Sequence, residues 1–520
     1  MASSRRAVQS VTSPLDQAEA ACRGGEYERA LRLLGGARFD RREDRVRSAI
    51  CQGRAALELD RPEAVAPFLE RAAKEAKGTD ETVPARMVLG AALARTNRRE
   101  QGEALLDEVA ALAQRSASQY AAEIAYHRAS SRLSAQRLGE AEEIVEAALP
   151  HAAGVARARL LQVLGRIDVR RENYAAAAHE FSAALGELDK SKSADVKARA
   201  RILNALGLIA AETIDLRLGR LVRREYETTT WSDDTRAEHA HILDYLGWLS
   251  LLEGEVARAW DERQLALTLA AETDFHALAL IGAAQLAGVV GDRFSESRYL
   301  DLAGTLLLHD HSGSGAERRI AMLSFVAAVP AANAETARKV LALYDRTRPR
   351  RTDAPAFEGD RALDAQEHYA RGKAALAEGR TQPGIAELQQ ALELWSQLAY
   401  RLRAALVAND LRAITGDRRY AQAALESLRN TPNAWLRPVL ERRTTEDDPL
   451  GQLTPAERRV LAELCKGKKA REIAAGFDRS FNTINNHTRA IFSAFGVRSR
   501  AALVAECARL GILDDIKSLR

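Results

Sequence analysis

Between Ser480 and Phe495 the chain reads SFNTINNHTRAIFSAF. If this stretch is a helix, the apolar residues Ile484, Ile491 and Phe495 share one stripe, at spacings of seven and four residues. The opposite stripe carries the polar residues Asn482, Asn485, Asn486, Arg489 and Ser493. Asparagine is a poor helix former, and a face that only meets solvent more often carries Glu and Lys. We therefore interpret the polar stripe as a surface that recognises hydrogen-bond donors and acceptors.

The residues on either side of this stretch predict three further short helices. Thr454, Pro455 and Glu457 combine an N-cap, a proline at the first helical position and a capping box, which together open a helix. Gly467 and Gly496 are expected to end two of the helices. The four predicted helices cover residues 455–466, 470–477, 480–495 and 500–510, with a tight turn at 478–479.

A helix, a tight turn and a second helix with a polar outer face form the unit that places a recognition helix in the DNA major groove. Asparagine can bind adenine through two hydrogen bonds, and arginine can bind guanine in the same way. We therefore predict base contacts from Asn482, Asn485, Asn486 and Arg489. Phosphate contacts are expected where the two helices begin, from Lys468, Lys469, Arg471, Ser480 and Thr483.

A resemblance to the LuxR/GerE-type helix-turn-helix domains covers residues 453–503, which read LTPAERRVLAELCKGKKAREIAAGFDRSFNTINNHTRAIFSAFGVRSRAAL. The matching residues are Leu453-Thr454-Pro455, Glu457, Val460-Leu461, Gly467, Glu472-Ile473-Ala474, Ser480, Thr483-Ile484, His487, Ile491 and Gly496-Val497. The resemblance implies a domain at 451–513 followed by a tail at 514–520, with double-stranded DNA as its partner. It also implies a homodimer, at least on DNA, formed by the fourth helix through Ala501, Ala502, Ala505 and Arg509.

The sequence departs from that family at positions expected to affect DNA recognition. Family members usually carry Lys or Arg at the position of Asn485, and often a charged pair at the positions of Phe481 and Asn482. A missing cation at position 485 is expected to weaken nonspecific affinity and to shift base preference, so the operator does not follow by analogy. Phe495 replaces a common leucine. We interpret His487 as a structural residue of the helix rather than a metal ligand.

Residues 15–430 show a loose helical repeat. Leu-Gly pairs recur at Leu164-Gly165, Leu206-Gly207 and Leu246-Gly247, with Leu286-Ala287 next, at spacings of 42, 40 and 40 residues. A helix pair cannot bury its apolar face alone, so such pairs stack into a superhelix. The pattern resembles tetratricopeptide-type repeats, although their usual period is about 34 residues, and another α-solenoid is the alternative. We expect an all-α chain, with a tetratricopeptide-like α-solenoid followed by the four-helix C-terminal domain.

The remaining segments predict connections between these parts. Residues 1–14 are expected to be a flexible N-terminus, and residues 431–450 a linker. Residues 347–360 are rich in proline and charge, which predicts a long loop or a joint between two sub-arrays.

The repeat register also predicts a concave groove. If Leu246-Gly247 occupies the usual repeat position, then His241, Asp244 and Trp248 face this groove. The same register adds Arg159, Gln162, Arg166 and Asn204. A groove with mixed polar and aromatic lining can bind a peptide, a protein or a small molecule, and we expect the unknown effector to bind there.

Composition and charge narrow the classes of function. The chain has 520 residues, 46% apolar and 28% charged, which is typical of a folded protein with more than one domain. Residues 450–520 carry 13 Lys and Arg against 7 Asp and Glu, a net charge of +6, whereas the whole chain has +4. This distribution is typical of an appended nucleic-acid binder. No apolar run of about 18 residues and no signal peptide are found, so no membrane contact is expected.

Motifs for nucleotide or metal chemistry are weak. Residues 311–319 contain glycines but lack the Gly-Lys-Ser/Thr of a phosphate-binding loop. The histidines at 309–311 and 238–241 have no further ligand cluster beside them. We therefore expect no enzyme activity, no cofactor and no metal.

The four cysteines are Cys22, Cys51, Cys465 and Cys507. They have no CxxC spacing, and we expect reduced, buried thiols in a cytosolic protein. A redox pair of Cys22 and Cys51 is an alternative for which the sequence offers no support.

Together these features predict a cytoplasmic, nucleoid-associated bacterial transcription regulator. Its helical array would sense a ligand or a protein partner and control the helix-turn-helix domain. The alternative is an interaction scaffold in which the helix-turn-helix no longer binds DNA specifically.

Overall fold

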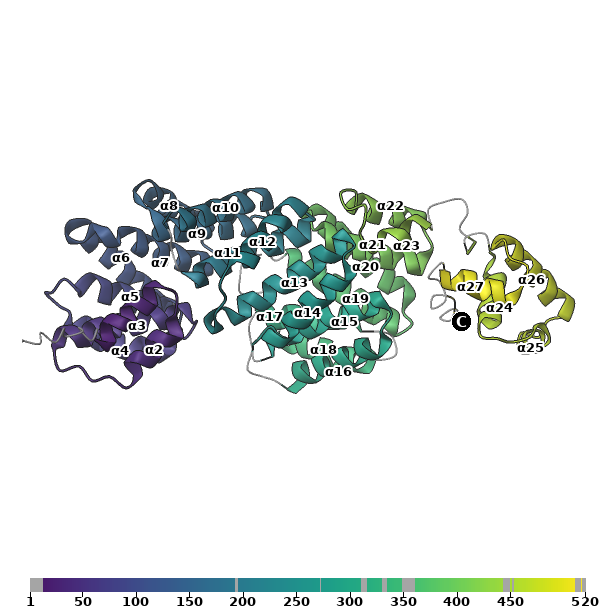
Figure 1. Ribbon diagram of the computed structural model, residues 1–520, viewed down its shortest axis with the longest axis horizontal. Helices are drawn as coiled ribbons and strands as arrows, with labels where there is room; N and C mark the ends of the chain where they lie inside the picture. The colour runs from purple at the N-terminus through teal and green to yellow at the C-terminus, as the bar shows by residue number, and fades with distance from the viewer. Residues whose placement is uncertain are drawn as a thin grey trace, which may run out of the picture.

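The computed structural model describes residues 13–191, 195–271, 273–309, 316–329, 334–347, 361–442, 449–450, 453–509 and 516. Every regular element in these ranges is helical, so the all-α prediction is confirmed. Figure 1 shows an array of stacked helices from α1 to α23, with the last four helices as a separate bundle at one end.

The array is built from helices that pack against their neighbours in sequence. The first ten are α1 (Pro14–Arg23), α2 (Tyr27–Gly35), α3 (Arg42–Glu58), α4 (Pro62–Glu75), α5 (Thr82–Ala94), α6 (Arg99–Ser116), α7 (Ala121–Ser134), α8 (Leu138–Ala148), α9 (Gly154–Arg170) and α10 (Tyr174–Lys190). The next seven are α11 (Val196–Thr213), α12 (Leu216–Thr228), α13 (Arg236–Glu253), α14 (Val256–Ala270), α15 (His276–Val290), α16 (Arg293–His309) and α17 (Ala316–Ala328). The last six are α18 (Ala334–Thr347), α19 (Arg361–Ala377), α20 (Thr381–Gln397), α21 (Arg401–Thr415), α22 (Arg418–Ser427) and α23 (Arg437–Arg442). Three short 3₁₀ turns, η1 (Ser118–Tyr120), η2 (Leu149–His151) and η3 (Asp233–Thr235), precede α7, α9 and α13.

Glycines stand where two helices of a pair come closest. A Cβ atom added to Gly165 would lie 2.9 Å from the ring of Phe181, where α9 meets α10. A Cβ atom added to Gly102 would lie 2.3 Å from the backbone nitrogen of Ala94, where α6 meets α5. Both distances are shorter than normal carbon contacts, so these approaches require a residue without a side chain. The recurring Leu-Gly pair at Leu164-Gly165 therefore has a packing reason.

The last helices of the array pack back on its middle. One buried apolar cluster joins α21–α23 to α11–α13. The Trp435 backbone N–H donates to the Leu251 carbonyl at 3.2 Å, and the rings of Trp435 and Trp248 lie 5.8 Å apart. Arg403 donates to the Glu212 carboxylate at 2.9 Å across 191 positions of sequence. The array therefore contains a long-range contact that a simple linear stack would lack.

The packed array extends past the predicted boundary at residue 430. Thr431, Ala434 and Leu440 are completely buried, although the sequence predicted a linker over 431–450. Ala434 and Leu440 belong to the same buried apolar cluster as residues of α11, α12 and α13. The segment after residue 430 is therefore packed against the middle of the array. Residues 443–448 lie outside the described residues, as do 1–12 of the predicted N-terminus and 348–360 of the predicted joint.

Across the described ranges, no helix combines the length and the apolar character needed to cross a membrane.

Candidate nucleic-acid interface

Four helices form the C-terminal bundle: α24 (Pro455–Cys465), α25 (Ala470–Gly476), α26 (Phe481–Ala494) and α27 (Arg500–Arg509). Their bounds agree with the predicted helices to within two residues. The predicted capping box is present, because the Thr454 N–H donates to the Glu457 carboxylate at 2.8 Å and the Glu457 N–H donates to the Thr454 hydroxyl at 3.3 Å. The bundle has its own apolar core, which draws only on residues from Leu450 onward among the described residues.

The turn between α25 and α26 sets the angle of the second helix. Asp478 has a φ of 51°, in the left-handed region that reverses the chain direction within a few residues. Ser480 then caps α26, since the Thr483 N–H donates to the Ser480 hydroxyl at 3.0 Å. The structure therefore contains the predicted helix, tight turn and second helix.

α26 has a buried face and an exposed polar face. Ile484 and Ile491 are 1% and 0% exposed and lie in the core of the bundle. The residues on the other side are Asn482, Asn486, Arg489 and Ser493, which are exposed, and Asn485, which is half-buried. Three of the four side chains predicted to contact bases are thus exposed on one face of α26, and the fourth, Asn485, is only partly accessible.

The cations predicted to contact phosphate lie in different environments. Lys468 pairs with Glu463 at 2.5 Å, and the Arg471 guanidinium lies 5.7 Å from the centre of the Phe481 ring. Lys469 is exposed at the N-cap of α25, where its backbone N–H donates to the Glu472 carboxylate at 2.7 Å. Its ammonium group is therefore the simplest of the three to test for a phosphate contact. The hydroxyls of Ser480 and Thr483, 2.8 Å apart, lie at the start of α26.

His487 connects α26 to α24, the first helix of the bundle. Its Nδ1 lies 3.7 Å from the carboxylate of Glu457. Hydrogen bonds from the backbone and hydroxyl of Thr454 lower the pKa of Glu457, so that carboxylate stays charged near neutral pH. This position supports the interpretation of His487 as a structural residue.

α27 presents small residues to solvent. Ala501, Ala502 and Ala505 are exposed, while Leu503 and Cys507 on the other side are completely buried. Arg509 ends the helix, and its side chain lies outside the described residues. The three alanines predicted to form a dimer contact are therefore exposed, and the contact itself stays a prediction.

The predicted groove residues of α9 are largely engaged within the array. Arg159 pairs with Glu58 at 3.1 Å and with Asp195 at 3.3 Å. Gln162 is buried and donates to the Ala198 carbonyl at 3.1 Å. Arg166 is exposed. The Oδ1 atom of Asn204, on α11, is buried without a hydrogen-bond partner among the described residues.

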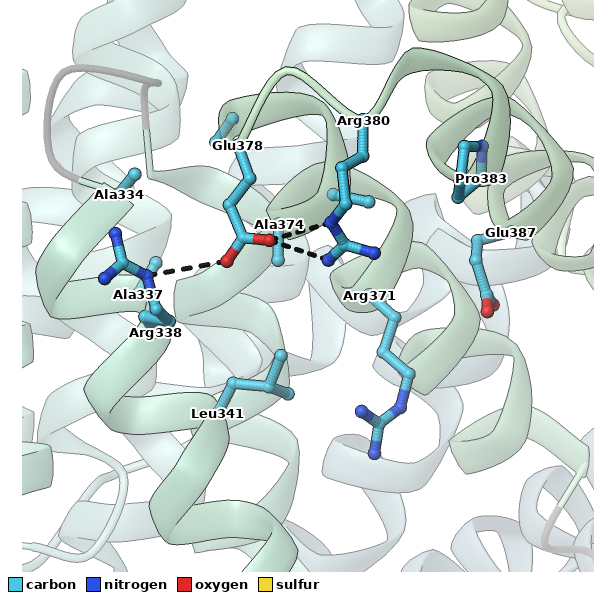
Figure 2. A pocket seen from close by; sticks show the side chains of 12 residues that line it. Ala334, Ala337, Arg338, Leu341, Arg371, Ala374, Glu378, Arg380, Pro383 and Glu387 are labelled. Carbon is cyan, nitrogen blue, oxygen red and sulfur yellow. Dashed lines mark hydrogen bonds and ion pairs between the residues drawn. The ribbon is translucent and has the colours of Figure 1, made fainter.

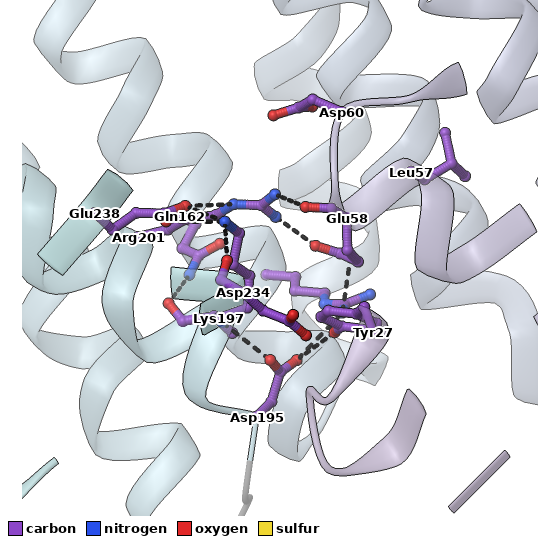
Figure 3. A network of polar contacts seen from close by, with 12 residues as sticks. Tyr27, Leu57, Glu58, Asp60, Gln162, Asp195, Lys197, Arg201, Asp234 and Glu238 are labelled. Atoms are coloured by element: carbon purple, nitrogen blue, oxygen red, sulfur yellow. Dashed lines mark hydrogen bonds and ion pairs between the residues drawn. The ribbon is translucent and has the colours of Figure 1, made fainter. Parts of the chain in front are cut away.

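A polar network joins the first helices of the array to its middle (Figure 3). Glu58, at the end of α3, meets Arg159 of α9 and Arg201 of α11, and the Arg201 side chain also donates to the Glu58 carbonyl at 2.8 Å. Close by, Lys197 pairs with Glu238 at 2.7 Å. The partners of Glu58 lie more than 100 positions away in sequence, so sequence patterns carried no signal for this network.

Glu58 should make this contact sensitive to acid. Burial by itself would raise the pKa of the Glu58 carboxyl, but Arg159, Arg201 and Arg95 together lower it to about 2, from 4.5 for an unperturbed glutamate. A carboxyl group whose pKa is lower in the folded than in the unfolded protein stabilises the fold at pH values above its unfolded pKa. This contribution is lost as the pH falls through the folded-state pKa.

We therefore expect the urea midpoint of the wild-type chain to fall between about pH 4.5 and pH 2 more steeply than that of a Glu58→Gln variant. Circular dichroism at 222 nm along a pH series would measure it. Glu426→Gln, in an exposed pair with Arg429, is the control and should follow the wild type. Parallel pH profiles for the wild type and Glu58→Gln would contradict the role assigned to Glu58.

The predicted groove residues of α13 make buried contacts. The His241 ring stacks on Phe275 with centroids 3.7 Å apart. Asp244 pairs at 2.9 Å with Arg263, whose side chain is 1% exposed. The Arg263 guanidinium also lies 4.5 Å from the centre of the Trp248 ring. These three groove residues therefore hold α13 against its neighbours, and the sequence had not identified Arg263.

A hollow of about 230 Å³ lies between α18, α19 and α20 (Figure 2). Glu378 lies between Arg338 and Arg380, at 3.5 and 2.7 Å. Arg371, the third arginine of the lining, pairs with Asp345 at 2.5 Å. Because each arginine already has a carboxylate partner, we assign no anion to this hollow. Among the described residues, no group of three or more His, Cys, Asp or Glu side chains could hold a metal ion.

Residues 451–506 match the family described as bacterial regulatory proteins, luxR family. The C-terminal bundle is therefore a LuxR-family helix-turn-helix domain, the DNA-binding part of a transcription regulator. No curated protein matches the chain. The solved structures that are similar at low identity include two that cover most of the chain. The apo form of RapI is 11% identical with a TM-score of 0.37, over 76% of this chain and 98% of that chain. The Naa15/Naa10 complex bound to HypK-THB is 12% identical with a TM-score of 0.23, over 96% of this chain and 91% of that chain.

Proposed function

We propose that the chain is a sequence-specific transcription regulator whose helical array responds to a ligand or protein partner and thereby controls the helix-turn-helix domain. The observation that carries the proposal is the exposed stripe of Asn482, Asn486 and Arg489 on α26, opposite a fully buried apolar face. Such side chains supply the hydrogen bonds that distinguish adenine and guanine in the major groove. In this proposal the protein acts without enzymatic activity, in the cytoplasm at the nucleoid.

The proposal assigns base contacts to Asn482, Asn485, Asn486 and Arg489. It assigns phosphate contacts to the starts of α25 and α26, and a homodimer contact on DNA to the exposed alanines of α27. The net charge of +6 over residues 450–520 supports a DNA partner, because nucleic acid is polyanionic.

Fluorescence anisotropy tests the proposal. The full chain and the fragment 445–520, whose described core is its own, would be titrated with the DNA upstream of its own gene and with a scrambled duplex, across a salt series. We expect salt-dependent preference for one duplex by the fragment, and weaker binding by the full chain if the array restrains the domain. Equal affinity of both proteins for both duplexes would contradict the proposal.

Lys469→Ala should weaken binding to every duplex alike. In this proposal Lys469 contacts a phosphate group and no base. Its loss should therefore reduce the slope of log K against log salt by about one unit. Lys190→Ala removes an exposed positive charge from α10, in the array, and should leave the slope unchanged. A change in base preference on Lys469→Ala would contradict the phosphate assignment.

A second candidate is an interaction scaffold whose helix-turn-helix has lost specific DNA binding. Asn485 favours it, because this central position of α26 is neutral and half-buried. On this alternative, neither the full chain nor the fragment would bind any duplex with sequence preference, while the array would still retain a protein partner.

A further inference from the structure

All four cysteines of the chain lie in two spatial pairs. Cys22, in the last turn of α1, and Cys51, in the middle of α3, have their sulfur atoms 3.1 Å apart. Cys465 ends α24 and Cys507 lies on α27, and their thiols are hydrogen-bonded within the core of the C-terminal bundle. All four are free thiols in this structure. The chain has no other cysteine, so none stands alone.

The geometry of the first pair is close to that of a disulfide. A disulfide bond is about 2.05 Å long, roughly 1 Å shorter than the distance between these two sulfur atoms. α1 and α3 already pack against one another, and the Cys22 thiol lies 3.7 Å from the Cys51 carbonyl oxygen. The two sulfur atoms therefore have to approach by only about 1 Å to reach bonding distance.

The surroundings of the first pair suit oxidation. Cys51 is 4% exposed, whereas Cys22 is only partly buried and can meet a small solute. The hydrogen bond between the two thiols lowers the pKa of Cys51 and raises that of Cys22. Arg54, one turn beyond Cys51, also lowers the pKa of Cys51. Thiolate character on one sulfur is what both peroxide chemistry and disulfide formation need.

We propose that Cys22 and Cys51 are a reversible modification site, at which a peroxide converts the two thiols into a disulfide. Each sulfur loses one proton and one electron, and a sulfur–sulfur bond forms. The peroxide O–O bond breaks and takes up both protons and both electrons, so hydrogen peroxide leaves as two water molecules. A dithiol reductant restores the two thiols by exchange through a mixed disulfide.

The disulfide would act on the part of the array that carries the polar network. It ties α1 to α3, and α3 ends at Glu58, which meets Arg159 and Arg201. Oxidation is therefore expected to increase the protection of α1–α3 from hydrogen exchange. This inference does not depend on DNA binding by the C-terminal domain.

Peptide mapping of the full chain tests the proposal. The protein would be treated with hydrogen peroxide, its remaining thiols alkylated, and the product digested with trypsin. We expect at least a tenfold rise in one cross-linked pair, residues 7–23 joined to residues 48–54, lighter by two hydrogen atoms than the separate peptides. Dithiothreitol should return both peptides to their alkylated forms.

Two variants keep this test specific. Cys51→Ala should abolish the cross-link and leave Cys22 available for alkylation. Cys465→Ala leaves the first pair intact and should form the cross-link as the wild type does. The proposal is overturned if both Cys22 and Cys51 remain alkylated after peroxide, if either one pairs with Cys465 or Cys507, or if they oxidise to sulfinic acid without the cross-link.

Discussion

Replacing Arg489 by alanine should reduce the discrimination between the operator and random DNA by about 1–3 kcal/mol, or roughly 5- to 150-fold in the ratio of the two dissociation constants. Arg489 is exposed on α26, on the side opposite the buried Ile484 and Ile491. Its guanidinium can donate two hydrogen bonds to the O6 and N7 atoms of guanine, and alanine can donate none. Competition anisotropy with operator and scrambled duplexes, at one salt concentration, measures the ratio.

Two comparisons make the Arg489 result interpretable. Asn485→Ala should reduce the same discrimination between operator and random DNA by about 1–3 kcal/mol if this asparagine binds adenine through two hydrogen bonds. Lys469→Ala should lower both affinities and leave the ratio unchanged. If Arg489→Ala instead weakens binding to both duplexes by the same factor, then Arg489 contacts phosphate. The polar stripe of α26 would then not be the surface that contacts bases.

Replacing Asp244 by asparagine should lower the stability of the array by about 3–5 kcal/mol, because it leaves a buried arginine without its counter-charge. Arg263 is 1% exposed, and its three nitrogens make no hydrogen bond within the described part of the chain. Burial raises the pKa of Asp244 and lowers that of Arg263, which shows that desolvation opposes both charges. Asp244 at 2.9 Å is the charge that compensates Arg263. The shift of the urea midpoint, followed by circular dichroism, measures the loss.

A double variant separates charge from packing at this site. Asp244→Asn combined with Arg263→Met removes both charges and keeps a long apolar side chain over Gly247 and Trp248. Because desolvation offsets much of the attraction in a buried pair, the double variant should recover most of the stability. Glu426→Gln, in an exposed pair, should cost less than about 1 kcal/mol. A double variant as unstable as Asp244→Asn alone would show that packing, and not charge, dominates.

The C-terminal domain could be predicted almost completely because its signals are local. The Thr454–Glu457 capping box and the Ser480 cap each link residues three positions apart, and the structure contains both. The alternation of Ile484 and Ile491 with polar residues depends only on the helical period. These local features predict which face of α26 is buried, because they do not depend on any distant part of the chain.

The array was predicted in its class but not in its contacts. The Leu-Gly pairs indicated close helix packing, and Gly165 and Gly207 indeed meet the rings of Phe181 and Tyr245. The same register assigned Asp244 and Trp248 to a ligand groove, whereas in the structure they contact Arg263. A repeat register specifies which side of a helix faces inward. It does not specify which distant side chain occupies the space that this side faces.

The amino-acid pattern alone therefore established the helices, their buried faces and the polar face of α26, because each depends on residues within one or two helical turns. Only the tertiary structure brought Glu58 to Arg201, Asp244 to Arg263, and Cys22 to Cys51. These pairs are 143, 19 and 29 positions apart, so their meeting depends on how successive helices turn and stack. Neither helical periodicity nor capping predicts that geometry, because both relate residues that are close in sequence. The three contacts join side chains on different helices.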